Sequence, residues 1–202
     1  MADINSKTRA ATPATVESGG ESEGEPDRLT PVDAAGSADL VKFVELLFFA
    51  YRDFTGDADE LLADLGYGRA HHRVIHFVAR HPGLRVADLL DILRITKQSL
   101  ARVLKQLIDD AFVTQRSGET DRRERHLYLT QKGQNFAAKL TQVQCARVGN
   151  ALNVVGIEGS EQVEAFLTAM ITDQDQAAVA ALFEKAMMHE HKPQRGRTGD
   201  PQ

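Results

Sequence analysis

Cysteine is almost absent from this 202-residue chain, which holds Cys145 alone. One cysteine cannot build an internal disulfide framework or a zinc site made only of cysteines. Long hydrophobic runs are also missing, since the stretch at residues 46–51 falls far short of the ~20 apolar residues that span a bilayer. The first 30 residues lack the apolar core of a signal peptide. Together these absences predict a protein of the reducing cytoplasm.

The signatures of common enzyme classes are missing as well. The sequence has no Gly-rich phosphate loop, no Gly-x-Ser-x-Gly elbow and no paired carboxylate set that stands out. Cys145 has no catalytic nucleophile signature around it. The sequence therefore predicts a protein that is not an enzyme and that needs no cofactor.

Positive charge is concentrated in one block of an otherwise acidic chain. The composition is ordinary for a globular protein, with 42% hydrophobic and 26% charged residues, and the net charge is −5. Residues 69–133 nevertheless carry 13 Lys and Arg against 7 Asp and Glu, while the segments on both sides are net acidic. Such asymmetry indicates a localised anionic partner, with nucleic acid as the first candidate, although chance clustering on a solvated face would give the same count.

The length suggests one domain with tails. Residues 1–36 and 189–202 are poor in apolar side chains, so we expect a disordered acidic arm and a disordered tail. The core opens with a helix expected at residues 38–54, followed by a loop. This helix is apolar on more than one side, and in a small domain the second partner surface is often another subunit. Its apolar residues are Leu40, Val41, Phe43, Val44, Leu47, Phe48, Tyr51 and Phe54.

Three further helices are expected before a hairpin, over residues 67–80, 86–93 and 96–111. Thr96 is a suitable N-cap for the last of them, because its hydroxyl can accept a free first-turn N–H. The last helix also shows the clearest pattern in the chain, an apolar stripe about 140° wide with a polar face opposite. The stripe consists of Leu100, Val103, Leu104, Leu107, Ile108 and Ala111, and the polar face carries Gln98, Ser99, Arg102, Lys105 and Gln106.

A β-hairpin follows, with strands expected at residues 113–116 and 126–130. Residues 117–121 supply turn chemistry, and Leu127 and Leu129 should face inward by alternation. Four arginines lie in the turn and in the strand residues next to it. Charged side chains at a strand edge can serve only to discourage aggregation, but four arginines beside one turn are more than that role requires. These arginines are Arg116, Arg122, Arg123 and Arg125.

Two helices joined by a tight break and followed by a two-stranded ribbon form a winged helix-turn-helix, a mainly α fold with a small β-hairpin wing. Such a helix fits the major groove of duplex DNA, and an arginine-tipped ribbon can follow the adjacent phosphates. The expected elements after the wing are helices at residues 131–154, 160–171 and 175–188, the first capped by Thr130.

Several short motifs occur in the order and spacing of a known family. They are residues 96–104, the pair Leu107-Ile108, the triplet Asp121-Arg122-Arg123 and the run from Leu129 to Gly133. On these residues the chain resembles the MarR family of bacterial transcriptional regulators, and the helix order agrees across residues 37–188. One departure is Ala111, where the family often has a glycine, so we expect a slightly different exit from the helix.

The resemblance implies a division of roles along the chain. Dimerisation would involve the helix and loop of residues 37–66 and the helices of residues 134–188. DNA binding would fall to residues 67–133, with the recognition helix at residues 96–111 and the wing at residues 112–130. A twofold homodimer would read a pseudo-palindromic operator with half-sites about one helical turn apart.

The resemblance also implies individual DNA contacts. In the family, the aspartate of the wing's Asp-x-Arg orients an arginine toward the minor groove, which implies these roles for Asp121 and Arg123. The recognition helix would present Lys97, Gln98, Ser99 and Arg102, with Lys105 nearer the phosphates, and the remaining wing contacts to phosphate would come from Arg116, Arg122 and Arg125.

Four residues are candidates for an effector pocket, because small molecules bind in the family where the dimerisation helices meet the DNA-binding part. They are Tyr51, His72, Arg73 and His76. The two histidines are one helical turn apart and could ligate zinc, but no Glu or Cys nearby completes a set. We therefore interpret these histidines, with His71, as satisfied polar residues at that junction.

Cys145 could be a redox switch, but sensing cysteines in this family lie near the N-terminal helix, and a lone helical cysteine is more often a small buried residue. Alternatives to a DNA-binding regulator are a winged-helix module for protein contacts and a metal- or redox-responsive regulator. The polar and cationic outward face of residues 96–111 favours DNA, since a protein-contact module would carry an apolar face there.

Overall fold

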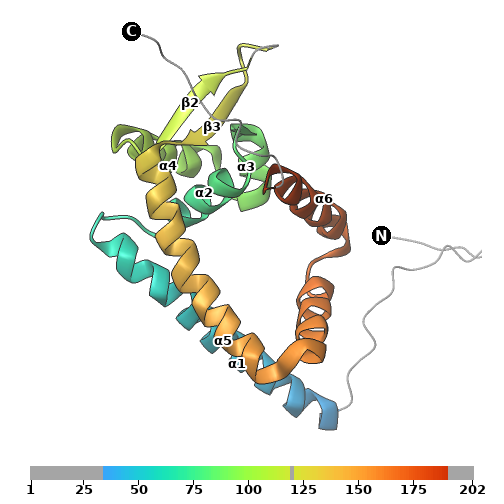
Figure 1. Ribbon diagram of the computed structural model, residues 1–202. Helices are drawn as coiled ribbons and strands as arrows, with labels where there is room; N and C mark the ends of the chain where they lie inside the picture. Colours follow the sequence, from blue (N-terminus) through green and yellow to red (C-terminus); the bar gives the residue numbers. More distant parts are fainter. Residues whose placement is uncertain (1–33, 119–120, 191–202) are drawn as a thin grey trace, which may run out of the picture. The chain divides into compact units, whose positions relative to one another are not determined.

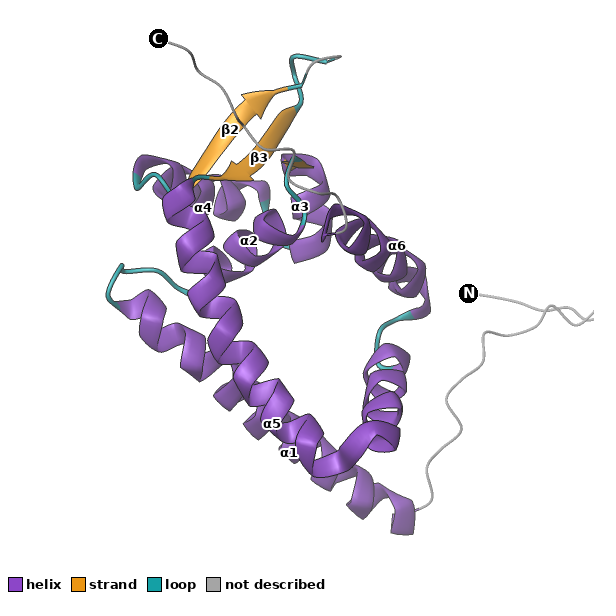
Figure 2. Cartoon of the chain, viewed as in Figure 1, coloured by secondary structure: helices purple, strands orange, loops and turns teal. Residues whose placement is uncertain are grey.

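The computed structural model describes residues 34–118 and 121–190, and it confirms a mainly helical chain with a small antiparallel sheet (Figures 1 and 2). Residues 1–33, 119–120 and 191–202 lie outside the described residues, and with them most of the arm and tail expected to be disordered. Residues 34–36 and 189–190 are helical, in α1 and α6, so the expected disorder is wrong there. The elements are α1 (Ala34–Ala63), α2 (Arg69–Arg80), β1 (Leu84–Arg85), α3 (Val86–Leu93), α4 (Lys97–Asp109), β2 (Val113–Ser117), β3 (Arg125–Leu129), α5 (Gln131–Ala169) and α6 (Asp173–Glu190).

The first helix, α1, extends beyond both ends of the helix expected at residues 38–54. The loop expected between this helix and the next is therefore confined to residues 64–68. The helix continues through Gly56 because the following turns bury side chains such as Leu62, which is fully buried. The Thr55 hydroxyl also supports the helix, since it donates to the carbonyl of Tyr51 at 2.9 Å. Burial therefore outweighs the low helix propensity of glycine, which costs about 1 kcal/mol relative to alanine.

The core lies where α2, α3 and α4 pack against the sheet. Val74, Ile75 and Val78 of α2 are fully buried, and Leu89 of α3 packs with them. Fully burying one aliphatic side chain stabilises a fold by about 1.5–3 kcal/mol, so these contacts fix the face that α4 turns to solvent. The apolar stripe predicted on α4 is buried at Leu100, Val103, Leu104 and Leu107.

The predicted hairpin is confirmed, with each strand displaced or extended by one residue. The strand order is β1-β3-β2, and both pairs are antiparallel. Leu127 of β3 pairs with Gln115 on one side and Leu84 on the other, and it is fully buried. Leu129 is half-buried and packs against the same core, so both leucines face inward as predicted. The two-residue strand β1 was not predicted, because Leu84 and Arg85 are too short a run to show alternation.

The chain leaves α4 through Ala111, which adopts the left-handed conformation that suits glycine, with φ of 59°. The expectation that alanine would change the exit from this helix is therefore wrong. Tertiary contacts hold the turn: the Thr130 hydroxyl donates to the carbonyl of Ala111 at 2.7 Å, and the ring of Phe112 is buried directly after it. An L-residue in this conformation carries about 1–2 kcal/mol of strain.

The C-terminal half consists of two long helical segments. α5 is interrupted at Gly156, with φ of 75°, two residues beyond the helix end predicted at residue 154. The helices predicted at residues 160–171 and 175–188 correspond to the rest of α5 and to α6. In the part of the chain that the structure describes, no helix is long and apolar enough to cross a membrane.

Candidate nucleic-acid interface

The recognition helix α4 begins at a capped turn. The hydroxyl of Thr96 accepts the Ser99 backbone N–H at 3.2 Å and donates to the Ser99 hydroxyl oxygen at 2.9 Å. The predicted N-cap is thus confirmed, and the first turn is fixed by its own side chains. The candidate DNA-contacting residues of this helix are all exposed: Lys97, Gln98, Ser99, Arg102 and Lys105.

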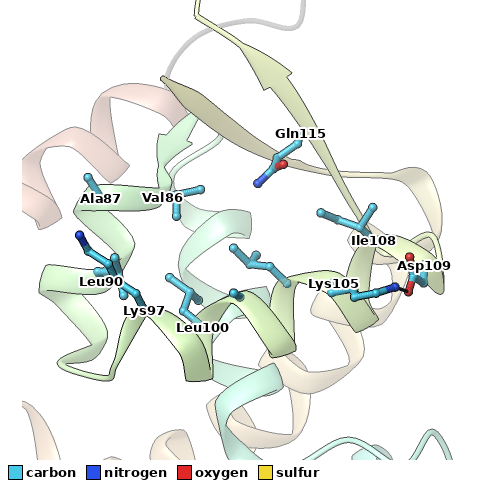
Figure 3. A pocket seen from close by; sticks show the side chains of 11 residues that line it. Val86, Ala87, Leu90, Lys97, Leu100, Lys105, Ile108, Asp109 and Gln115 are labelled. Carbon is cyan, nitrogen blue, oxygen red and sulfur yellow. Dashed lines mark hydrogen bonds and ion pairs between the residues drawn. The ribbon is translucent and has the colours of Figure 1, made fainter. Parts of the chain in front are cut away.

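A groove of about 600 Å³ runs between α3, α4 and strand β2 (Figure 3). Its floor is apolar, with Leu100 and Ile108 of α4 facing Val86 of α3. Polar side chains stand at its edges, Lys97 at the start of α4 and Gln115 on β2 (Figure 3). The structure therefore brings part of the recognition helix and the base of the wing to one concave surface.

Lys105, at the far end of this groove, pairs with a carboxylate of its own helix. Its Nζ lies 2.5 Å from Oδ2 of Asp109, four residues on, and this contact raises the pKa of Lys105. Both side chains are exposed, so the pair contributes little to stability, but it offsets the charge that Lys105 presents to solvent. The sequence analysis missed this partner, although Lys–Asp spacing of four in a helix is a recognisable signal.

Asp121 acts on the main chain of the wing. Its Oδ1 accepts the backbone N–H of Arg123 at 2.8 Å, and its carbonyl accepts the Glu124 N–H at 3.1 Å. The carboxylate therefore shapes the turn, and the guanidinium of Arg123 is placed through its backbone rather than by a direct contact with Asp121. Arg122 and Arg123 are exposed beside it.

The two strands of the wing hold their own arginines. The Arg116 guanidinium lies 4.7 Å from the ring centre of Tyr128 on β3, whose direct partner across the hairpin is Thr114. Arg125 donates from Nη1 to the Ser117 hydroxyl at 2.5 Å. Both arginines stay exposed, so these contacts restrict their orientation without removing them from solvent.

Arg85, which the sequence analysis did not single out, links α3 to the wing. It donates to both carboxylate oxygens of Asp88 at 2.8 and 2.6 Å and to Oε1 of Glu124 at 3.1 Å. The guanidinium lowers the pKa of Asp88. A cleft of about 410 Å³ beside it is lined by Gln115, Arg123, Glu124 and Arg125 among others. The Arg-x-x-Asp spacing at the start of α3 was visible in the sequence, but the contact with Glu124 was not.

His71 connects α2 to the recognition helix. Its ring stacks on Tyr67 with 4.6 Å between the ring centres. Nδ1 accepts the Gly68 N–H at 3.1 Å, so the proton is on Nε2, which lies 3.0 Å from Oε1 of Gln106 and donates to it. Both ring nitrogens are therefore satisfied, as interpreted from the sequence.

The candidate effector residues lie on two helices, Tyr51 on α1 and the remaining three on α2. His72 is buried, and burial lowers its pKa; burial also lowers the pKa of His76, which is half-buried. Arg73 donates to the carbonyl of Leu93 at 3.2 Å, whereas Tyr51 is exposed beneath the guanidinium of Arg69. A cleft of about 680 Å³ lies between α3 and α6, and none of these four candidate residues lines it.

Cys145 is exposed on α5, so its interpretation as a buried residue is wrong. Within residues 34–118 and 121–190, no three His, Cys, Asp or Glu side chains gather as a metal site would require.

The sequence is similar to those of known transcriptional regulators. The sequence profile of the MarR family matches residues 65–124. The HTH-type transcriptional regulator PetP of Rhodobacter capsulatus is 48% identical over 132 residues, which cover 65% of this chain and 80% of PetP.

Solved structures show a similar fold at low sequence identity. The Staphylococcus aureus MepR–DNA complex has a TM-score of 0.54 at 19% identity, over 63% of this chain and 95% of MepR. MepR in its DNA-binding conformation has a TM-score of 0.57 over the same shares, also at 19% identity. The transcriptional regulator SlyA has a TM-score of 0.55 at 14% identity, over 72% of this chain and 98% of SlyA.

Proposed function

The chain belongs to the MarR family of transcriptional regulators, and on that premise we propose that it binds a pseudo-palindromic operator in duplex DNA as a homodimer whose affinity a small-molecule effector modulates. The observation that carries this proposal is the set of exposed polar and cationic side chains on the first turn of α4, together with the exposed arginines of the wing. A groove lined by Lys97 of α4 and Gln115 of β2 connects the helix to the base of the wing. This surface lies in the only net-basic block of the sequence, residues 69–133. A MepR structure of similar fold contains DNA, which supports the same use here.

Within this proposal, α4 reads base edges and the wing contacts the backbone. Gln98 and Arg102 carry the donors and acceptors that discriminate bases in the major groove, and Lys97 and Ser99 lie beside them on the same exposed turn. Arg123 enters the minor groove. The phosphate contacts come from Lys105, Arg116, Arg122 and Arg125.

Dimerisation is supported by apolar surface that a monomer leaves in solvent. Phe48 of α1 is 70% exposed, Ile157 of α5 is 85% exposed and Phe183 of α6 is 61% exposed. Exposed apolar area on this scale is typical of a subunit interface. We assign dimerisation to residues 37–66 and 134–188 and DNA binding to residues 67–133. Other large apolar residues of these helices that are half or more exposed include Phe43, Leu46, Phe49, Leu167, Met170 and Met187.

We assign effector binding to the junction near Tyr51, His72, Arg73 and His76. Arg73 touches the end of α3 through the Leu93 carbonyl, directly before the turn that leads to α4. A ligand that displaces this contact would change the balance between DNA-competent and incompetent arrangements of the two lobes of a dimer.

The test is selection of duplexes from a randomised pool by the full chain, with excess non-specific competitor and light scattering for stoichiometry. We expect a pseudo-palindrome with half-sites about one helical turn apart and two protomers bound to each duplex. A monomer in solution, or a pool with no enriched sequence, would contradict the proposal.

Matched variants then test the role of the recognition helix α4 in binding the selected duplex. Gln98→Ala or Arg102→Ala should cost about 1–3 kcal/mol of specific binding and relax preference at one position of each half-site. Arg69→Ala is the control, since Arg69 is an exposed arginine paired with Asp59 at 3.0 Å on the first turn of α2, outside the groove. Equal losses for all three variants would remove α4 from the interface.

A further inference from the structure

Arg85 holds together the two sides of the cleft at the base of the wing. Its guanidinium contacts Asp88 on α3 through two hydrogen bonds and Glu124 on the wing through a third. We propose, building on the proposed DNA binding, that Arg85 is a positioning residue: it sets the wing against α3 and thereby places Arg123 at the minor groove and Arg125 at the phosphates.

The geometry favours a fixed orientation for this arginine. The two bonds to Asp88, at 2.8 and 2.6 Å, form the planar bidentate arrangement that fixes a guanidinium more strongly than a single contact. Asp88 lies in the first turn of α3, so the guanidinium is anchored to a helix that packs in the core. With Nε and Nη2 bound to Asp88, the remaining nitrogen of Arg85, Nη1, donates to Oε1 of Glu124 at 3.1 Å.

The contacts continue around the base of the wing. The other carboxylate oxygen of Glu124 lies 3.2 Å from Nε2 of His126. His126 in turn donates from Nδ1 to the carbonyl of Gly83, at 2.8 Å, in the turn before β1. A neutral imidazole that donates from Nδ1 has no proton on Nε2 to give to Glu124, so the contact that holds the Glu124 carboxylate is the one from Arg85.

Glu124 sits directly between the two arginines whose placement matters. Arg123, Glu124 and Arg125 are consecutive and line the same cleft as Arg85. Fixing the side chain of Glu124 restricts the backbone on both sides of it, and so restricts where the two flanking guanidinium groups can reach. A carboxylate on a DNA-facing surface repels phosphate, so a structural role of this kind explains its position.

The charge of Glu124 makes the proposal testable by the sign of an effect. If Glu124 acts only as a nearby negative charge, Glu124→Ala tightens binding of the selected duplex. If it acts as the link between Arg85 and the wing, Glu124→Ala weakens binding, by about two- to fivefold, as expected for loss of an exposed ion pair. In an Arg85→Ala background the link is already broken, so we expect Glu124→Ala to cause no further weakening there.

The measurement is the dissociation constant of the selected duplex for wild type, both single variants and the double variant, with Arg69→Ala as the control for removal of one exposed arginine. Arg85→Lys keeps the charge but not the planar fork, and we expect it to bind more weakly than wild type. Restoration of wild-type affinity by lysine would assign Arg85 to direct phosphate contact and overturn the proposal.

Three other results for Glu124→Ala also overturn the positioning role. They are tighter binding in the wild-type background, unchanged binding in that background, and weakening of the same size in the wild-type and Arg85→Ala backgrounds. Thermal unfolding of each variant shows that the fold is retained. If the wild-type chain selects no duplex, the proposed DNA binding itself is wrong. If it binds a duplex but Arg85 and Glu124 show no coupling, only the positioning role is wrong.

Discussion

The hydroxyl of Tyr67 donates a hydrogen bond to Oδ2 of Asp110 at 2.7 Å. Tyr67 lies between α1 and α2, and Asp110 is the C-cap of α4, so this bond joins the end of the recognition helix to the segment that follows α1. The Tyr67 ring is buried and also contacts Phe112 edge-on, with 5.5 Å between the ring centres. The position of α4 is thus fixed at its C-terminal end by polar and aromatic contacts, and at its first turn by its own cap.

Tyr67→Phe removes the hydroxyl of this bond and keeps the buried ring. Because Asp110 is exposed and can be solvated again, we expect the free energy of unfolding to fall by only about 1 kcal/mol. The measurement is urea unfolding at a fixed protein concentration, since a dimer's stability depends on concentration. Tyr128→Phe, which removes a hydroxyl from the wing outside this contact, is the matched control and should change stability less.

Ala111→Gly should stabilise the protein. Alanine occupies a left-handed position with φ of 59°, where glycine carries no Cβ strain, so we expect a gain of about 1 kcal/mol in the free energy of unfolding. The control is Ala138→Gly on the exposed side of α5, where the same substitution should cost about 0.5–1 kcal/mol. Opposite signs for the two variants in thermal or urea unfolding would confirm the strain, and a loss at both positions would disprove it.

The helix-turn-helix and wing could be predicted because their patterns are local. α3 has the predicted bounds, and Thr96 caps α4 as its hydroxyl chemistry requires. The glycine that ends the Leu-Thr-x-x-Gly motif has a different reason, a close approach across the hairpin, since a Cβ on Gly133 would lie 2.1 Å from the carbonyl oxygen of Phe112.

What the sequence analysis missed depends on contacts between distant residues. α1 runs past Gly56 because Leu62 is buried by other elements, and strand β1 exists because Leu84 pairs with Leu127. The contact between Arg85 and Glu124 spans 39 positions and has no local pattern. Side-chain partners of this kind are set by the packed fold, so residue spacing alone does not reveal them.

Arg123→Ala should weaken DNA binding and make it less salt-dependent. Each phosphate that a cation neutralises adds about one to the slope of log affinity against log salt, so we expect the slope to flatten by about one. The measurement is titration of the selected duplex at several salt concentrations. Arg69→Ala, outside the wing, should leave the slope unchanged. An unaltered slope for Arg123→Ala would show that this arginine neutralises no phosphate charge from the minor groove.

Acidification should destabilise the protein through the histidines of α2. Burial lowers the pKa of His72 below its ordinary value, and burial together with His72, Arg80 and His81 lowers the pKa of His76. Between the folded pKa and the unfolded value near 6.5, the unfolded chain binds more protons, so the free energy of unfolding falls as pH falls through that window. For each histidine the loss is about 1.4 kcal/mol per pH unit of separation between the two pKa values.

Urea unfolding between pH 7.5 and 5.5 measures this decline. His72→Gln removes one titrating group, so its stability should fall less steeply with acidification than that of the wild type. Gln144→Ala is the informative counterpart, because the side-chain hydrogen bond between His72 and Gln144 favours the protonated form of His72, and its loss should extend the decline to lower pH. Identical pH profiles for wild type and His72→Gln would show that His72 keeps its ordinary pKa in the folded protein.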